Sequence, residues 1–207
     1  HRSPCMVTQV ATNSLDKKIA ESVVQGCAMM VAHKELTLAI GMQVAQGLQH
    51  LHSFGLVHGC LWPNNIVLGG NATVKLADYG RAKETVLKLH TNLDGAANAG
   101  DHRRPSYAAP EILSGQDFSM DADVFSLGCV LVRMGLTKPL YTVELATRSW
   151  EEFCSALASG EISPVDAMRR EAMDADELPL PVMDLAAHCC KAVPRQRVTI
   201  KVAARTL

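Results

Sequence analysis

Aromatic residues are scarce in this sequence of 207 residues, where Phe, Tyr and Trp together make up 4%. A core with so few rings must be packed mainly from aliphatic and small side chains. Hydrophobic residues nevertheless reach 48%, which is enough to bury a core and argues against a disordered chain. The length suits one domain, or two small ones.

Long apolar runs are also missing, because charged residues or glycines interrupt them well before the roughly 20 residues that a membrane-spanning helix needs. We therefore expect no membrane span in this chain. The 20 Lys and Arg nearly balance the 21 Asp and Glu, which argues against a dedicated nucleic-acid binder. No signal peptide is visible, but the chain opens on His1 and not on Met. We expect a processed or truncated piece, for which an upstream targeting segment stays open.

The seven cysteines include no Cys-x-x-Cys pair, and their odd number argues against a disulfide framework. We therefore expect a reducing compartment and an intracellular, cytoplasmic protein. His188, Cys189 and Cys190 superficially suggest a metal-ligand cluster. Because neighbouring side chains on a helix point in different directions, we do not expect a zinc site there.

The hydrophobic pattern predicts a mostly helical chain with small β elements. Apolar residues recur every three or four positions over 35–52, and residues 121–135 are apolar on nearly all sides, which is typical of a central buried helix. We expect further helices over 15–32 (with Ser14 as N-cap), 149–159, 180–191 and 199–206, a strand over 4–10, and a hairpin of 65–68 and 73–77. Residues 90–106 are expected to form an exposed loop, and residues 160–179 a surface connection.

Five short motifs follow one another along the chain. They are 58–65 (HGCLWPNN), 78–80 (DYG), 109–111 (APE), 123–128 (DVFSLG) and 194–197 (PRQR). In this order and spacing they resemble the C-terminal lobe of a eukaryotic protein kinase, with its H-R-D-L-K-P-x-N, D-F-G, A-P-E, D-x-W-S-x-G and P-x-x-R motifs.

The resemblance implies a mostly α fold with small β-hairpins, which is α+β overall if an N-terminal lobe exists upstream. It divides the chain into two parts. Residues 1–12 would form the hinge and the last strand of the N-terminal lobe, and residues 13–207 the C-terminal lobe. Within that lobe, 58–65 would be a catalytic-loop remnant and 78–111 the equivalent of the activation segment.

The resemblance also implies roles for single residues. Asn65 and Asp78 stand where the family holds Mg²⁺ against the phosphates of ATP, and oxygen donors suit that ion. Thr8 and Val67 would lie on the adenine side of a bound nucleotide. The structural positions are His58 and Tyr79 in the apolar stack that links the lobes, Asp123 as the anchor of that stack, and Glu111 with Arg197 as a buried ion pair. Whether ATP and Mg²⁺ still bind stays open at this point.

Three residues of the catalytic loop depart from the family pattern, all against the chemistry. Cys60 replaces the aspartate that accepts the proton of the substrate hydroxyl, and a thiol, mostly protonated at neutral pH, is a poor acceptor. Trp62 replaces a lysine beside the transferred phosphoryl group; an indole carries no charge, and we expect its bulk near the substrate hydroxyl. Gly59 replaces the arginine that grips a phosphorylated activation loop. No catalytic residue is then intact, which indicates a pseudokinase.

A retained scaffold with lost chemistry leaves three functions open. The first is a scaffold or regulatory binding module with a protein partner, for which the helices near 149–159 and 180–191 are candidate contact faces. The second is a weak or atypical ATP-dependent Ser/Thr kinase that uses Asn65, Asp78 and an upstream lysine. The third is a structural subunit of a larger assembly.

Overall fold

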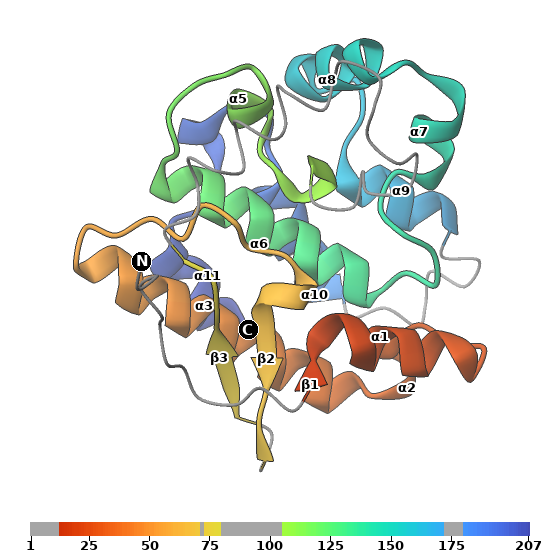
Figure 1. The fold of residues 1–207 in the computed structure, drawn as a ribbon, viewed down its shortest axis with the longest axis vertical. Helices are drawn as coiled ribbons and strands as arrows, with labels where there is room; N and C mark the ends of the chain where they lie inside the picture. Colours follow the sequence, from red (N-terminus) through yellow and green to blue (C-terminus); the bar gives the residue numbers. More distant parts are fainter. Residues whose placement is uncertain (1–12, 71–72, 80–104, 172–179) are drawn as a thin grey trace, which may run out of the picture.

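The structure, a computed structural model, describes residues 13–70, 73–79, 105–171 and 180–207. The expected strand over 4–10 with Thr8, the hinge assigned to residues 1–12 and most of the expected loop over 90–106 lie outside these ranges. Figure 1 shows a mostly helical molecule with one small antiparallel sheet, which confirms the predicted fold class.

Helix α6 (Met120–Met134) runs through the centre of the molecule, and nearly all its side chains are buried. Helix α10 (Leu180–Cys189) and helix α3 (Lys34–Ser53) both pack against α6. Helix α11 (Ile200–Thr206) packs against α3. The all-round apolar pattern of α6 is explained by this position, because a helix covered by neighbours on several sides needs no polar face. These four helices confirm the predicted ones to within a few residues.

The sheet has three strands in the order β1 (Asn13–Ser14), β2 (Ile66–Leu68) and β3 (Val74–Leu76). The predicted hairpin is confirmed, with Val67 paired to Lys75 and the amide of Gly69 bonded to the carbonyl of Thr73 at 2.8 Å. The sequence did not predict β1, since a two-residue strand is too short to show an alternating pattern.

One helix was expected over 15–32, and the structure corrects this to two, α1 (Leu15–Val24) and α2 (Met29–Ala32). The chain turns at Gly26, whose φ of 82° is left-handed and ends the helical path. Ser14 caps α1 as predicted, because its side chain accepts the amide of Lys17 at 3.3 Å.

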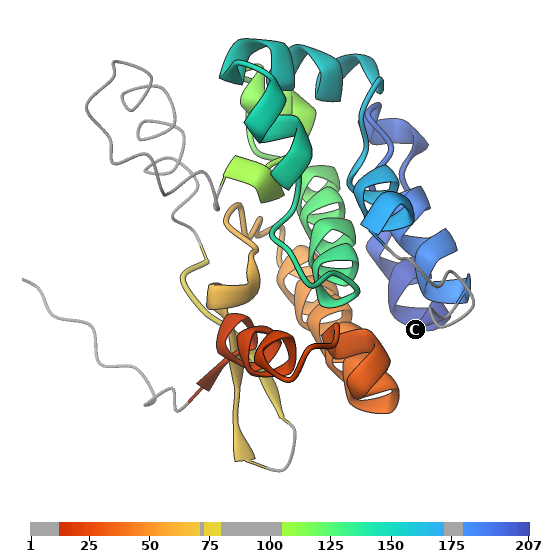
Figure 2. The same ribbon diagram turned by 90° about the vertical axis from the view of Figure 1, so that its right-hand side faces the viewer.

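The prediction of a surface connection over 160–179 is wrong for residues 164–171, which form helix α9 (Pro164–Glu171). Its Val165 and Met168 are buried, and the helix packs on α6, so two apolar side chains outweigh the charged pattern that surrounds them. Short helices α5 (Pro110–Leu113) and α7 (Thr142–Thr147) lie with α8 (Trp150–Ser159) at the end opposite the sheet (Figures 1 and 2).

Two helices expected as contact faces use their apolar side chains inside the lobe. In α8, Phe153, Ala156 and Leu157 are buried. In α10, the buried apolar residues include Val182 and Leu185. Their apolar patterns therefore report core packing, and no exposed binding face follows from them.

In the part of the chain that the structure describes, three 3₁₀ turns connect the longer elements. They are η1 (Pro63–Asn65), η4 (Pro105–Tyr107) and η6 (Pro194–Gln196). Each begins with a proline, whose fixed φ suits the first position of a helical turn. Within the described ranges, no helix is both long and apolar enough to cross a bilayer.

Candidate functional site

The carboxylate of Asp123 holds the catalytic-loop remnant against α6. Its Oδ1 accepts the amide of Gly59 and its Oδ2 the amide of His58, both at 2.8 Å. Oδ2 also lies 2.8 Å from Nε2 of His52 in the last turn of α3. Asp123 is 1% exposed, so these three partners offset the cost of burying a charge. The three bonds fix the start of the loop to two helices.

Gly59 reaches the Asp123 carboxylate in a left-handed backbone conformation, with a φ of 69°. A side chain on this residue would cost about 1 kcal/mol, because its Cβ crowds the backbone there, whereas glycine avoids that cost. With Gly59, the chain lacks the cation that the family has at this position. The glycine also allows the left-handed turn to form without backbone strain.

The side chain of His58 is fully buried beneath this turn. Burial lowers the pKa of His58, and the negative charge of Asp123 opposes the shift only in part. Nδ1 of His58 accepts the amide of Cys60 at 3.3 Å, which places the proton of the neutral ring on Nε2. The imidazole thus acts as a neutral support for the loop.

Cys60, which the resemblance places at the position of the proton acceptor, is bound by Asn65. The Nδ2 amide of Asn65 donates to the carbonyl of Cys60 at 2.8 Å and lies 3.6 Å from the thiol sulfur. Asn65 is 5% exposed at the end of η1, so its amide is firmly positioned. The loop therefore presents a half-buried thiol at the position where the resemblance expects a carboxylate.

The structure brings Asn65 and Asp78 to the same end of the hairpin. The amide of Ala77 donates to the carbonyl of Asn65 at 2.9 Å, directly beyond the pairing of Ile66 with Leu76. Asp78 follows with a φ of 57°, a left-handed conformation that aspartate tolerates better than most residues. A carboxylate and a side-chain amide oxygen are ligands that Mg²⁺ accepts, so the two residues fit the ion that the resemblance implies.

The structure also describes three other residues of the predicted site. Trp62 is 8% exposed and belongs to the hydrophobic core, where it lines a cavity together with Cys60. Val67 is half-buried in β2 and Tyr79 is 57% exposed, and their roles beside a nucleotide and in the stack that links the lobes stay predictions. Thr8 lies outside the described residues.

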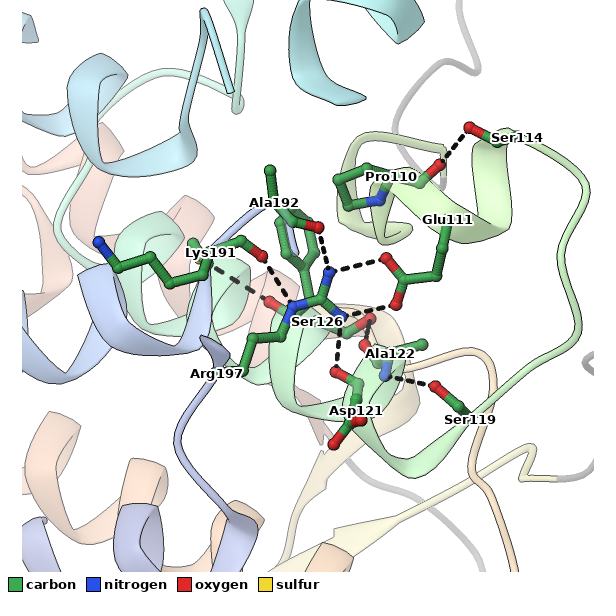
Figure 3. Close-up of polar contacts among 12 residues, drawn as sticks. Pro110, Glu111, Ser114, Ser119, Asp121, Ala122, Ser126, Lys191, Ala192 and Arg197 are labelled. Atoms are coloured by element: carbon green, nitrogen blue, oxygen red, sulfur yellow. Dashed lines mark hydrogen bonds and ion pairs between the residues drawn. The ribbon is translucent and has the colours of Figure 1, made fainter. Parts of the chain in front are cut away.

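Glu111 and Arg197 form a bidentate ion pair (Figure 3). The two N–O distances are 2.6 and 2.7 Å, and the side chain of Arg197 is fully buried. The guanidinium also donates to the carbonyls of Asp121, Lys191 and Ala192, and it lies 5.0 Å from the ring centroid of Phe125. This single side chain joins α5, the start of α6 and the chain after α10.

Two positioning residues escaped the sequence reasoning. His52 reaches Asp123, 71 residues later, and Ser126 Oγ donates to the carbonyl of Tyr107 at 2.8 Å. The available signals were a histidine in the last turn before the first motif and the serine inside DVFSLG. Neither signal names its partner, since both partners are distant in sequence.

A metal cluster was not expected at His188, and the structure gives the residues there other surroundings. Nδ1 of His188 donates to the carbonyl of Asp184 at 2.7 Å, while Cys189 and Cys190 are buried. Over the described ranges, no group of three or more His, Cys, Asp or Glu side chains is arranged to hold a metal ion.

Comparison with known proteins gives consistent relatives. A probable serine/threonine-protein kinase of Dictyostelium discoideum is 27% identical over 172 residues, which cover 83% of this chain and 36% of that protein. A second one from the same organism is 33% identical over 158 residues, covering 76% of this chain and 15% of that protein. The serine/threonine-protein kinase TIO of Arabidopsis thaliana is 30% identical over 146 residues, covering 67% and 10%. The chain thus spans between 10% and 36% of the length of these relatives.

The family match extends over almost the whole sequence. The family model described as protein kinase domain matches residues 2–206. The mostly helical architecture, with its small antiparallel sheet, agrees with the C-terminal lobe of that family. The chain belongs to the protein kinase domain family.

Proposed function

We propose that this chain is part of a catalytically impaired kinase domain, a pseudokinase that serves as a scaffold or regulatory binding module for a protein partner. The observation that carries the proposal is the thiol of Cys60 at the position of the proton acceptor, held by Asn65. Loss of a positioned general base costs about 10²–10⁴-fold in rate. An intracellular, cytoplasmic location belongs to the same proposal and rests on the spacing of the cysteines.

Two neighbouring substitutions support this reading. Trp62 brings no charge to the phosphoryl group and is buried in the core. Gly59 brings no cation to a phosphorylated segment. In contrast, Asp123 still binds the loop to α6, and Arg197 still binds Glu111 in α5. A retained scaffold around altered chemistry supports recognition by surface as the remaining use of the fold.

An ADP-release assay on the full-length protein with Mg·ATP and a generic protein substrate tests the proposal. We expect turnover no higher than that of the Asp78→Ala variant, which serves as the matched blank. A Cys60→Asp variant shows how much of the defect comes from the missing carboxylate. Robust wild-type turnover that disappears on Asp78→Ala would contradict the proposal.

A second candidate is a weak or atypical ATP-dependent Ser/Thr kinase, and the adjacency of Asn65 and Asp78 favours it. Bound Mg²⁺ would neutralise charge on the phosphates, and these two side chains would hold it. The loose transition state of phosphoryl transfer asks little of a general base. A structural subunit of a larger assembly remains a third candidate, with no observation here that favours it.

Thermal unfolding with and without Mg·ATP separates the first two candidates. A ligand at 100 times its dissociation constant stabilises the folded protein by about 2.7 kcal/mol. A clear shift that Asn65→Ala and Asp78→Ala abolish would support a nucleotide-binding site and keep the kinase alternative. An unchanged melting temperature would leave the scaffold function as the better proposal.

A further inference from the structure

Trp62 is a large side chain that the chemistry of the proposed function does not use. It lines two separate cavities, and Tyr107 lines both with it. The smaller cavity is bounded by the catalytic-loop remnant, Ala109 and the start of α6. The other has a volume of about 160 Å³ and is bounded by α1 and by Leu140. Trp62 and Tyr107 are 8% and 7% exposed and belong to the same hydrophobic core.

The segment that begins at Ser106 is held by two further attachments. Ser126 on α6 donates to the carbonyl of Tyr107 at 2.8 Å, and Ser106 itself is buried. At the other end of the segment, Glu111 is bound by Arg197. All these attachments use groups of the unmodified chain, so none of them requires a phosphate.

We propose that Trp62 is a positioning residue that packs segment 106–113 against the catalytic-loop remnant, so that this face is ordered in the unphosphorylated protein. A lysine in its place would bring an ammonium group into a site that is 8% exposed, where burying an unpaired charge is costly. The indole offers a large apolar surface and loses little side-chain entropy on ordering. The tryptophan thus supplies an apolar attachment for this segment, while the electrostatic one is lost at Gly59.

This inference concerns order and not catalysis, so it holds for either candidate function. With Gly59, a phosphate on the activation segment would lack the family's arginine partner. Apolar packing by Trp62 together with the Ser126 bond supplies the attachment instead. The surface next to this segment would then be available to a partner at all times.

Amide hydrogen exchange on the full-length protein after phosphatase treatment tests the proposal directly. We expect the amides of 106–113 that are hydrogen-bonded in the structure, such as Ile112 and Leu113, to be protected about as well as those in the first half of α6. Exchange in this segment at the rate of an unstructured peptide, with α6 still protected, would overturn the proposal.

A pair of variants then identifies the residue responsible. Trp62→Lys should raise exchange in 106–113 by about tenfold, while Trp62→Phe, which keeps an aromatic surface, should change it less. Exchange in α11, which packs on α3, serves as the internal reference, and Trp150→Phe is the control for losing a tryptophan elsewhere. Unchanged protection of 106–113 in Trp62→Lys would overturn the assignment to Trp62. If Trp62→Lys exposes α11 as well, the Trp62→Leu variant is measured instead. We then expect faster exchange in 106–113 alone, and an equal rise in both regions would count against the proposal.

Discussion

Single residues of the catalytic loop combine a chemical role with a backbone requirement. Gly59 has lost the family's cation but still donates its amide to Asp123 from a left-handed conformation. Burial lowers the pKa of His58 and favours its neutral ring, while its backbone amide also donates to Asp123. The bonds of the loop to Asp123 therefore come from main-chain donors, which a change of side chain does not remove.

Replacing Gly59 tests the backbone requirement. Gly59→Ala should lower the free energy of unfolding by about 1 kcal/mol, since an alanine must adopt the left-handed conformation. Gly59→Asn should cost less, because asparagine tolerates this region. Urea unfolding of the three proteins measures the difference. An alanine variant as stable as the wild type would contradict the assigned conformation.

Titration of His58 should appear in the pH dependence of stability. Because its pKa is lowered in the folded protein, the unfolded chain binds the proton first as the pH falls below about 6.5. Its contribution to stability is therefore complete above that pH and is lost at lower pH. His58→Phe should lose less stability than the wild type between about pH 7.5 and 5.5. Equal losses in the two proteins, measured by thermal unfolding, would show that His58 does not titrate as described.

At the scale of secondary-structure elements, the close approach of α6 and α10 sets the packing of the lobe. Gly128 on α6 faces Cys189 and Cys190, and a Cβ at this position would lie 2.5 Å from the sulfur of Cys190 and 2.8 Å from the Cβ of Cys189. Real contacts are longer than this, so a side chain here would force the two helices apart. Glycine at position 128 is therefore required by packing.

Gly128→Ala should destabilise the protein by about 1–3 kcal/mol through overpacking. Gly41→Ala on α3 is the matched control, since its Cβ would first meet the flexible end of Leu131 at 3.0 Å. We expect the control to cost clearly less in the same denaturation assay. A reversed order of the two variants would disprove the α6–α10 contact as drawn.

The Glu111–Arg197 pair links elements that are 86 residues apart in sequence. Glu111→Gln leaves the Arg197 guanidinium buried with only part of its partners, so we expect a loss of about 3–5 kcal/mol. The double variant Glu111→Leu with Arg197→Met removes both charges and should recover part of that loss. Chemical denaturation of the single and double variants checks the order. If the double variant loses more free energy of unfolding than the two single variants lose together, this account is contradicted.

The sequence predicted elements well where one physical signal dominated. The periodic stripe of α3 and the all-apolar pattern of α6 gave helices close to the observed bounds. It failed where two signals conflicted. Charges around α9 hid the buried Val165 and Met168, and an uninterrupted helical pattern over 15–32 outweighed the glycine at 26.

At the site, the motifs led to Asn65 with Asp78 and to Glu111 with Arg197, because the family resemblance supplies partners that are far apart in sequence. His52 and Ser126 lacked that support, and their partners follow only from the folded backbone. The burial of Trp62 was missed for a related reason. Its surroundings include Tyr107 and Leu140, which line the same cavity and come from other parts of the chain.

At the scale of the whole molecule, α6 connects the two ends. The sheet lies toward one end, α5, α7 and α8 lie at the other, and the catalytic-loop remnant lies between them (Figures 1 and 2). Two of these regions have one tryptophan each, Trp62 in the loop and Trp150 in α8. One hydrophobic core includes buried residues from both regions, so we expect them to unfold together.

Fluorescence of two single-tryptophan proteins tests this cooperativity. Trp150→Phe reports on Trp62, and Trp62→Phe reports on Trp150. After correction for the stability change of each variant by circular dichroism, each fluorescence midpoint should coincide with the circular dichroism midpoint in urea. An earlier fluorescence transition for one tryptophan would show that its end of the molecule opens independently.

The ion pair between Glu111 and Arg197 has a consequence for the synthesis of the chain. The ribosome makes Glu111 long before Arg197, which follows 86 residues later. During that interval the carboxylate has no guanidinium to meet, and burying it alone would be unfavourable. The region around α5 should therefore close late during translation, and a nascent chain halted before Arg197 should leave it open to chaperones and proteases.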